Sequence, residues 1–243
     1  MNKQLLLENI RNVLVRLEDT ILFALIERAQ FLQNRRIYDA DALAETITHD
    51  SIVGYLLHET EKIHARMRRY TSPDEHPFYS ALPEPVLPAL RYDENPLKPN
   101  AVNLNDRIRT AYETEIVPYV CKPGDDRQYG SSAVCDVACL QALSKRIHYG
   151  KFVAESKYQA NEALFKRSIE AADEDTLRTL ITNTAVEDRV LKRVEWKAQI
   201  YGQNTNGHPA VDKINPARVV DIYRQWIIPL TKDVEIAYLL ARG

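Results

Sequence analysis

The stretch Leu140–Tyr158, LQALSKRIHYGKFVAESKY, places Arg146 and Lys157 eleven residues apart in a run that is typical of a helix. At about 100° per residue, eleven steps come to roughly three turns plus 20°, so both cations share a face, about 16 Å apart along the axis. Between them on that face lie Gly150 and Val153, which are small or apolar. Because an unpaired buried charge is too costly to keep, this face requires anionic partners. The partners are either the protein's own carboxylates or a small anionic ligand.

The composition is that of an ordinary globular chain. Its 243 residues are 45% hydrophobic and 27% charged, and 32 Lys and Arg against 34 Asp and Glu give a formal net charge of −2. A helical nucleic-acid binder would need a basic face, for which this balance gives little support. No apolar run is long enough to cross a bilayer, so no membrane partner is expected. The first twenty residues lack the features of a signal or transit peptide, which predicts a cytoplasmic location.

The hydrophobic periodicity is helical along most of the chain. Only seven glycines occur, and no hairpin dipeptide separates alternating apolar runs. Apolar residues step by three and four from Ile10 to Leu25, which predicts a long amphipathic first helix with Arg28 on the same stripe. A second helix is expected over Ser51–Tyr70, with the inward residues Ile52, Tyr55, Leu56, Ile63 and Met67. Further helices are expected near Asn105–Val120, Ser131–Tyr158, Asn161–Ala171, Asp173–Thr182 and Thr184–Tyr201.

Capping residues mark several of these ends. Asn105 is the expected cap of the third helix, and Ser131 or Ser132 that of the longest. The last helix is expected to begin after Asn215-Pro216, a good cap followed by proline at the first helical position. It would continue to about residue 241 with a kink at Pro229.

A proline-rich stretch interrupts the helical pattern. Seven of the twelve prolines lie between Pro73 and Pro99, which excludes a regular helix or a central strand there. Its aromatic and aliphatic content argues against a disordered linker, so we expect an extended strap over about 71–104 that packs on helices. A second irregular stretch, polar in composition, is expected at Gly202–Lys213. The prediction is one all-α domain, residues 1–243, with an internal strap.

Three local motifs suggest chemistry that the neighbouring residues do not support. Gly150-Lys151 lacks the upstream glycine and the following Ser or Thr of a phosphate loop. His58-Glu59 lacks the second histidine of a zinc protease, because Lys62 stands at that position. Cys135 and Cys139 lie one turn apart without a convincing completion of a metal site, and we expect core thiols. The residues therefore predict neither a metal nor a cofactor.

Several polar pairs on otherwise apolar helices remain. Asn183 and Glu187 are four residues apart, as are Thr231 and Glu235, and Arg11 follows an apolar position of the first helix. Spacing alone favours ordinary surface pairs and solvated charges. Together with the two cations of the first stretch, however, these side chains could line a bundle cavity for a small dianion.

Five blocks of the sequence resemble the all-helical chorismate mutases of fungi and plants. These collinear blocks are NIRNVLVRLEDTILFALIERA (9–29), RRYTSPDEHPFY (68–79), KPGDD (122–126), LSKRIHYGKFVAESKY (143–158) and IIPLTKDVEIAYLL (227–240). The resemblance implies an all-α homodimer with an active site inside the bundle of each subunit. It also implies a concerted conversion of chorismate to prephenate without metal or cofactor, in the synthesis of phenylalanine and tyrosine.

The resemblance also implies roles for the polar residues at matching positions. Arg11 and Arg146 would bind the two carboxylates of the substrate, a task that suits bidentate arginine geometry. Lys157 and Glu235 would meet the ether oxygen whose bond breaks. The ring hydroxyl and the remaining polar edges would be held by Asn183, Glu187 and Thr231. Because a carboxylate cannot donate to an ether oxygen, Glu235 has to be protonated.

Family members are often inhibited by tyrosine and activated by tryptophan at a site between subunits. The matching positions are Arg68, Arg69, Gly130 and Ser131, where free N–H groups at a helix start and two guanidinium groups would hold an amino acid's carboxylate. The alternative is an intersubunit salt bridge beside an ordinary cap. Regulated members often carry a hydroxyl residue where this chain has Asn215, so regulation by tyrosine is a hypothesis.

The second interpretation is that the chain is a homologue without catalytic activity, which acts as an interaction protein through its dimeric surface. All seven candidate pocket residues are present, which speaks against this interpretation, because an inactive site need not keep them.

Overall fold

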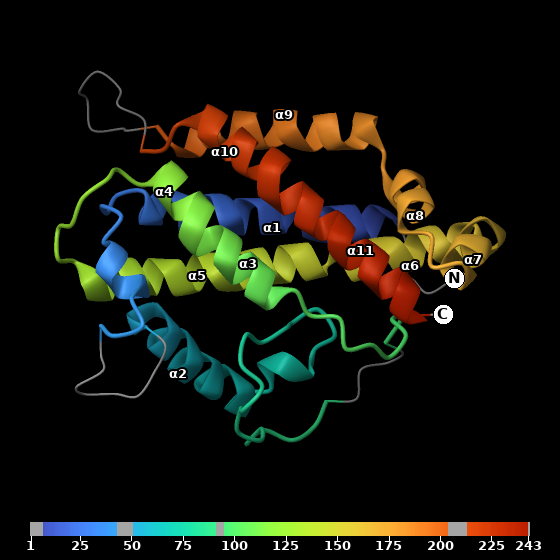
Figure 1. Ribbon diagram of the computed structural model, residues 1–243, viewed down its shortest axis with the longest axis horizontal. Helices are drawn as coiled ribbons and strands as arrows, with labels where there is room; N and C mark the ends of the chain where they lie inside the picture. The colour runs from blue at the N-terminus through green and yellow to red at the C-terminus, as the bar shows by residue number, and fades with distance from the viewer. Residues whose placement is uncertain (1–6, 43–50, 91–94, 204–212, 243) are drawn as a thin grey trace.

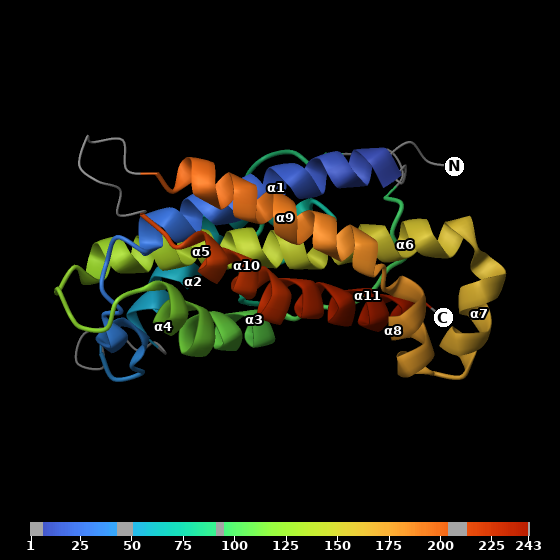
Figure 2. The same cartoon turned by 90° about the horizontal axis from the view of Figure 1, so that it is seen from above.

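Helix α1 (Leu7–Arg28) has the stripe that its spacing predicts, with Ile10, Leu17, Ile21 and Leu25 all buried. The computed structural model describes residues 7–42, 51–90, 95–203 and 213–242, and every regular element in these ranges is helical, as predicted. Three long helices, α1, α5 (Tyr129–His148) and α9 (Thr184–Tyr201), run roughly along the longest axis (Figures 1 and 2). Helix α11 (Ile228–Arg242) crosses them diagonally (Figure 1).

A fully buried ion pair joins α1 to α5. Arg28 Nε donates to Asp136 Oδ1 at 2.6 Å, and both side chains are at most 1% exposed. The hydroxyl groups of Tyr38 and Tyr112 also donate to the Asp136 carboxylate, at 2.7 and 2.6 Å. Two charges can be kept away from water only when their remaining hydrogen-bonding groups are satisfied in this way.

The predicted inward face of the second helix is only partly right: Ile52 and Leu56 are half-buried against the core, but the most buried stripe is another one. Helix α2 (Ile52–Arg66), capped by Ser51, buries a different stripe, made of Val53, Leu57, Glu61 and Ala65. Ile63 and Met67, expected inside, are 60% and 50% exposed. The stripe contains a carboxylate, Glu61, which accepts hydrogen bonds from the backbone N–H groups of two strap residues. Because one of its buried positions is charged, a hydrophobicity pattern does not reveal this stripe.

The expected single helix through Tyr158 is also wrong. It is divided at Tyr149 into α5 and α6 (Gly150–Ala160). Helix α5 begins at Tyr129 with Gln128 as its cap, so Ser131 and Ser132 lie inside the first turns. Asn105 is likewise the first residue of α3 (Asn105–Ala111) rather than its cap. Its amide instead donates to strap carbonyls, at 2.8 and 3.0 Å.

Two π-helical turns precede prolines. Segment η4 (Tyr112–Ile116) connects α3 to α4 (Val117–Val120), and η5 (Tyr223–Ile227) connects α10 (Pro216–Ile222) to α11. Each ends two residues before a proline, Pro118 or Pro229. Since proline has no N–H to donate, the longer turn changes the bonding pattern where the helix would otherwise break. The interruption expected at Pro229 therefore takes the form of a π turn just before it.

The remaining helices follow their predicted ranges closely. Helices α7 (Glu162–Glu170) and α8 (Glu174–Ile181) lie at one end of the bundle (Figure 2). Asn183 caps α9 by accepting from Val186 N–H, and Asn215 caps α10 by accepting from Ala217 N–H. The strap, over its described parts 72–90 and 95–104, contains neither helix nor strand. Of the irregular stretch expected at Gly202–Lys213, residues 204–212 lie outside the described ranges.

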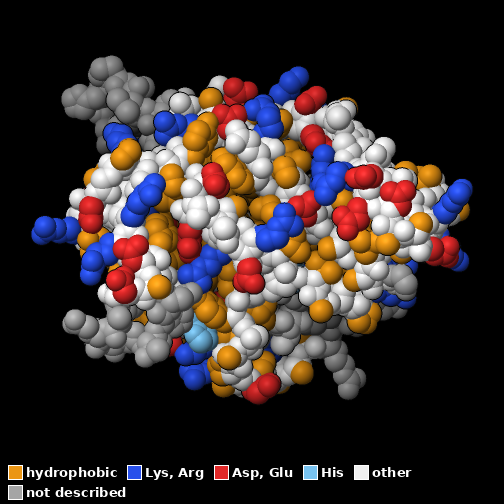
Figure 3. Space-filling model, viewed as in Figure 1, with side chains coloured by type: hydrophobic (Ala, Val, Ile, Leu, Met, Phe, Trp, Pro, Cys, Tyr) orange, Lys and Arg blue, Asp and Glu red, His pale blue; other side chains and the backbone are white. Residues whose placement is uncertain are grey.

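Surface charge is mixed on the face seen in Figure 3, where Lys and Arg side chains are interspersed with Asp and Glu. None of the helices in the described ranges is both long and apolar enough to span a membrane.

Candidate active site

A cavity of about 460 Å³ lies among the helices that carry the predicted site residues. Its size falls within the usual range for small-molecule sites, about 300–1,000 Å³. Apolar side chains such as Ile10, Leu14 and Val153 form part of its wall. The wall also contains all seven predicted polar residues, Arg11, Arg146, Lys157, Asn183, Glu187, Thr231 and Glu235. The fold thus brings together residues that are up to 224 positions apart in the chain.

Lys157 and Glu235 face each other across the contact between α6 and α11. Lys157 Nζ lies 2.8 Å from Glu235 Oε2 and donates to the Ile181 carbonyl at 2.6 Å. Burial raises the pKa of Glu235 above its usual value, and the nearby cations Lys157 and Arg146 only partly oppose this effect. A buried carboxyl with a raised pKa can hold the proton that a hydrogen-bond donor requires.

Arg146 is part of the cavity wall and has donor atoms without a partner. The residue is 6% exposed, and its Nε and Nη1 atoms are buried without a hydrogen-bond partner among the described residues. Buried N–H groups are almost always paired, so a guanidinium in this state calls for acceptors from a bound molecule. A planar carboxylate matches its geometry best.

The other predicted residues complete the rim and floor of the cavity. Thr231 Oγ1 donates to the Ile227 carbonyl at 2.7 Å. Asn183 uses its side-chain oxygen for the cap of α9. Arg11 is exposed, on the first turns of α1. Glu187 is paired with Lys232 at 2.8 Å, a cavity residue that the spacing argument missed. Lys232 lies three residues before Glu235 on the same helix face, and this spacing could have pointed to it.

Gly150 sets the distance between the two helices that carry Lys157 and Glu235. A Cβ atom at this position would lie 3.0 Å from the Thr231 carbonyl oxygen, 3.1 Å from Thr231 Cγ2 and 3.3 Å from Glu235 Cγ. Only a residue without a side chain allows α6 to approach the α11 backbone this closely.

The four predicted effector residues lie outside this cavity. Arg69 Nε pairs with Glu75 at 3.0 Å, and its Nη1 donates to Gln141 in the middle of α5 at 2.8 Å. Arg68 has a left-handed backbone, with φ 64°, and donates to a strap carbonyl. Gly130 and Ser131 are exposed in the first turn of α5, roughly 16 Å along the helix from Gln141. One chain by itself does not bring the two pairs together.

No cluster of three or more potential metal ligands occurs in the described ranges, and Cys135 and Cys139 are free thiols there. Fold and cavity together define an all-α protein that offers cationic and proton-donating groups to a small anionic molecule.

Comparison with known proteins identifies the family. The family described as chorismate mutase type II matches residues 128–236. The chorismate mutase of Schizosaccharomyces pombe is 49% identical over 247 residues, covering 100% of this chain and 98% of that protein. A crystal structure of AtCM1 with tyrosine in its allosteric site has a TM-score of 0.90 at 48% identity, covering 99% and 98% of the two chains. Aro7p chorismate mutase of Candida albicans, in complex with L-Trp, has a TM-score of 0.92 at 42% identity, covering 98% and 92%. The chain belongs to the chorismate mutase family, in its eukaryotic all-helical form.

The close approach at Gly150 predicts that an added side chain affects stability and turnover in opposite directions. In a helix interior, Gly→Ala normally adds about 1 kcal/mol of stability. Here we expect Gly150→Ala to lower turnover of chorismate by about ten-fold or more, since the added methyl group moves Thr231 and Glu235 away from Lys157. Steady-state kinetics and thermal unfolding of the variant check this. A variant that is both more stable and fully active would contradict it.

Proposed function

We propose that this cavity is where chorismate rearranges to prephenate, and that its seven polar residues act as follows. Arg11 and Arg146 bind the two carboxylates, while Lys157 and Glu235 act on the ether oxygen. The residues that hold the ring hydroxyl and the other polar edges are Asn183, Glu187 and Thr231. The observation that carries the proposal is that Arg146, which has two donor atoms without a partner, lines the same cavity as the Lys157–Glu235 pair.

The rearrangement requires the protein to supply only geometry and charge. A concerted rearrangement forms no covalent intermediate, so no nucleophile is required. The protein holds the substrate in the reactive conformation and stabilises the charge that separates as the ether bond breaks. Negative charge grows on the ether oxygen, where an ammonium and a carboxylic acid are the suitable partners.

Lys157 is held in place for this task before substrate arrives. Its hydrogen bonds to the Ile181 carbonyl and to Glu235 Oε2 fix the amine and leave one N–H group to point at the reacting oxygen. A donor fixed in advance costs no reorganisation at the moment of reaction, which is the physical basis of its contribution.

Substitution of Lys157 tests the proposal directly. We expect Lys157→Ala to lower kcat by about two to three orders of magnitude, corresponding to ~3–4 kcal/mol of lost transition-state stabilisation. The assay follows the loss of chorismate absorbance with purified protein. Absence of turnover in the unmodified chain, or an undiminished rate in the variant, would refute the proposed site.

Glu235 leads to a prediction about pH. Its pKa is raised by burial, and the protonated, donating form is present below that pKa and is lost as the pH rises through it. Activity should therefore fall with rising pH, and Glu235→Gln, whose amide donates at every pH, should remove the fall. A pH–rate profile of kcat for both proteins measures this. An unchanged alkaline limb in the variant would show that another group titrates.

We propose further that the protein is a homodimer that binds tyrosine and tryptophan between its subunits. The support is the wide separation of Arg69 from Gly130 within one chain, so that a second copy is needed to join them. Ile63 and Met67 at the end of α2 and Val134 on α5 are at least half exposed, an apolar area suited to a partner. The tyrosine complex of AtCM1 and the L-Trp complex of the Candida albicans relative support the two effectors.

The regulatory proposal predicts that millimolar tyrosine lowers the turnover of chorismate and that Arg68→Ala weakens this inhibition, since the variant loses a cation for the effector's carboxylate. Kinetics with and without tyrosine measure it, with light scattering to establish the dimer. Kinetics of the unmodified chain that do not respond to tyrosine would contradict the effector role.

We also propose that the protein works in the cytoplasm. Its three cysteines are free thiols, as a reducing compartment keeps them. Fractionation of cells that express the chain would test the location, and recovery in an organelle would contradict it.

A further inference from the structure

Helix α6 follows α5 after an interruption of one residue, Tyr149, and runs on in nearly the same direction (Figures 1 and 2). It also makes contacts of its own with α11 and the strap. Lys157, which reaches into the cavity, lies near the end of α6, about 9 Å along the axis from Lys151 in its first turn. Whatever fixes the first turn of α6 therefore also fixes the placement of Lys157.

Besides the bonds of Lys157 and the apolar packing of α6, three residues tie this helix to its neighbours. Gly150 packs directly on the α11 backbone. The carboxylate of Glu155 accepts hydrogen bonds from the Tyr238 hydroxyl and from Arg242 Nε, both at 2.7 Å, near the end of α11. Lys151 makes the third contact, and it points to the strap instead of α11.

Lys151 is an unusual buried cation. It is 2% exposed, and its Nζ donates to the Val102 carbonyl at 2.5 Å and to His76 Nε2 at 2.7 Å. None of the carboxylates in the described ranges lies within ion-pair distance of it. Burial lowers the pKa of Lys151 to about 8, so the amine still carries its third proton at neutral pH.

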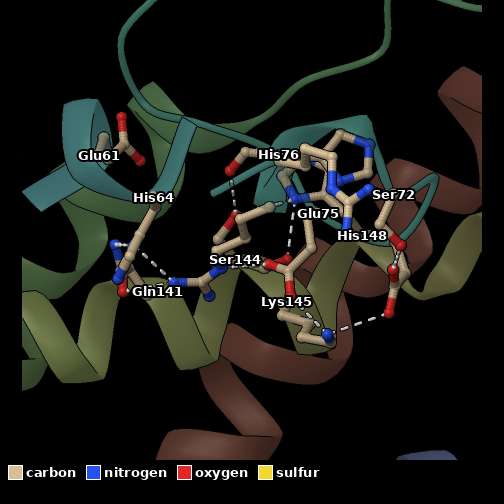
Figure 4. A network of polar contacts seen from close by, with 12 residues as sticks. Glu61, His64, Ser72, Glu75, His76, Gln141, Ser144, Lys145 and His148 are labelled. Atoms are coloured by element: carbon tan, nitrogen blue, oxygen red, sulfur yellow. Dashed lines mark hydrogen bonds and ion pairs between the residues drawn. The ribbon is translucent and has the colours of Figure 1, made fainter. Parts of the chain in front are cut away.

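His76 accepts from this cation, a second histidine, His148, stacks on it, and both rings stay neutral. Their rings are stacked, with centroids 4.2 Å apart (Figure 4). His148 Nε2 accepts from Leu104 N–H at 3.0 Å, so its Nδ1 carries the proton that goes to the Ser144 carbonyl. Burial, followed by the neighbouring His148 and then Lys151, lowers the pKa of His76 to about 2, while burial lowers that of His148 to about 4.

The two ends of the strap meet at this point. His76 lies near its start and Val102 near its end, and Lys151 bridges them. The His76 carbonyl also accepts from Ser144 Oγ, at 3.2 Å, and from the Asn105 amide, at 3.0 Å. Figure 4 shows His76 beside His148 and the hydrogen bond from Ser144. The strap is thus closed on the junction between α5 and α6.

Stability alone does not account for a lysine here. A buried ammonium without a carboxylate is costly, and because His76 Nε2 accepts from it, the proton of the neutral ring stays on Nδ1, a buried atom without a partner. We propose that Lys151 is a positioning residue for the rearrangement, since its buried amine fixes the first turn of α6 on the strap and so holds Lys157 at the cavity. The inference rests on the proposed role of Lys157.

A double-mutant cycle in kcat tests the inference. Lys151→Met keeps the length and the helix-forming tendency of the side chain but removes its hydrogen bonds. We expect kcat to fall by about ten-fold or more, since a displacement of about 1 Å can cost a hundred-fold, with KM changed less than about two-fold. In the Lys157→Ala background the same substitution should add less than about a two-fold loss, because its effect passes through Lys157.

Lys145→Met is the matched control. Lys145 also ties the strap to a helix, through ion pairs with Asp74 and Glu75, but the helix is α5. Its removal should leave kcat within about two-fold of the unmodified enzyme. An equal loss of kcat in this control would show that loosening the strap anywhere is sufficient, and would contradict a specific role of Lys151.

Other outcomes also decide the question. An unchanged kcat in folded Lys151→Met, or an equal loss with and without Lys157, overturns the inference and leaves the proposed function intact. Full activity in Lys157→Ala contradicts both. If Lys151→Met does not fold, His76→Phe replaces it, because this variant keeps the ring stack and removes one acceptor of Lys151. We then expect a loss of about three-fold that disappears in the Lys157→Ala background, and an unchanged kcat contradicts the inference.

Discussion

The contact between α6 and α11 is the constraint on which the site depends. Gly150 lets the first turn of α6 lie against the Thr231 backbone, at a distance that a residue with a Cβ could keep only if Thr231 or Glu235 moved. Two turns further along, this closeness puts Lys157 Nζ 2.8 Å from Glu235. The strap and the end of α11 hold the same helix from other sides, through Lys151 and Glu155. The placement of the Lys157 amine thus depends on residues that are far apart in the chain.

The electrostatics of the cavity follow from burial. Removal from water favours the protonated form of Glu235, and it leaves two donor atoms of Arg146 without a partner. Both conditions are unfavourable for the protein alone. A molecule with carboxylates and an ether oxygen relieves both, because it supplies acceptors to the guanidinium and to the carboxylic acid. In the proposed function, the site is complementary to charge that the substrate brings and that the reaction develops.

Much of this architecture could be predicted from the sequence, and the exceptions have physical reasons. The stripe of α1 and the cap Asn215 follow from local chemistry, and the structure confirms them. The buried face of α2 could not be found from hydrophobicity, because it includes Glu61, whose burial depends on strap N–H groups far away in the sequence.

Tertiary contacts also explain what spacing missed between and within helices. No proline marks the interruption at Tyr149 in the sequence. The glycine that follows it is explained by the close approach of α11 and not by the conformation of the turn. The polar residues of the cavity were found from their pairwise spacing together with a family resemblance, whereas spacing alone favoured surface pairs. Lys232 escaped notice because its partner, Glu187, lies on another helix. The roles of these residues stay a proposal.

The central claim is that the buried Glu235 acts beside Lys157 in its protonated form, which burial favours. The most direct measurement is an infrared difference spectrum between the unmodified protein and Glu235→Gln. The account predicts a carbonyl band of a protonated carboxylic acid that the substitution removes. A difference spectrum that shows only the loss of an ionised carboxylate would contradict it.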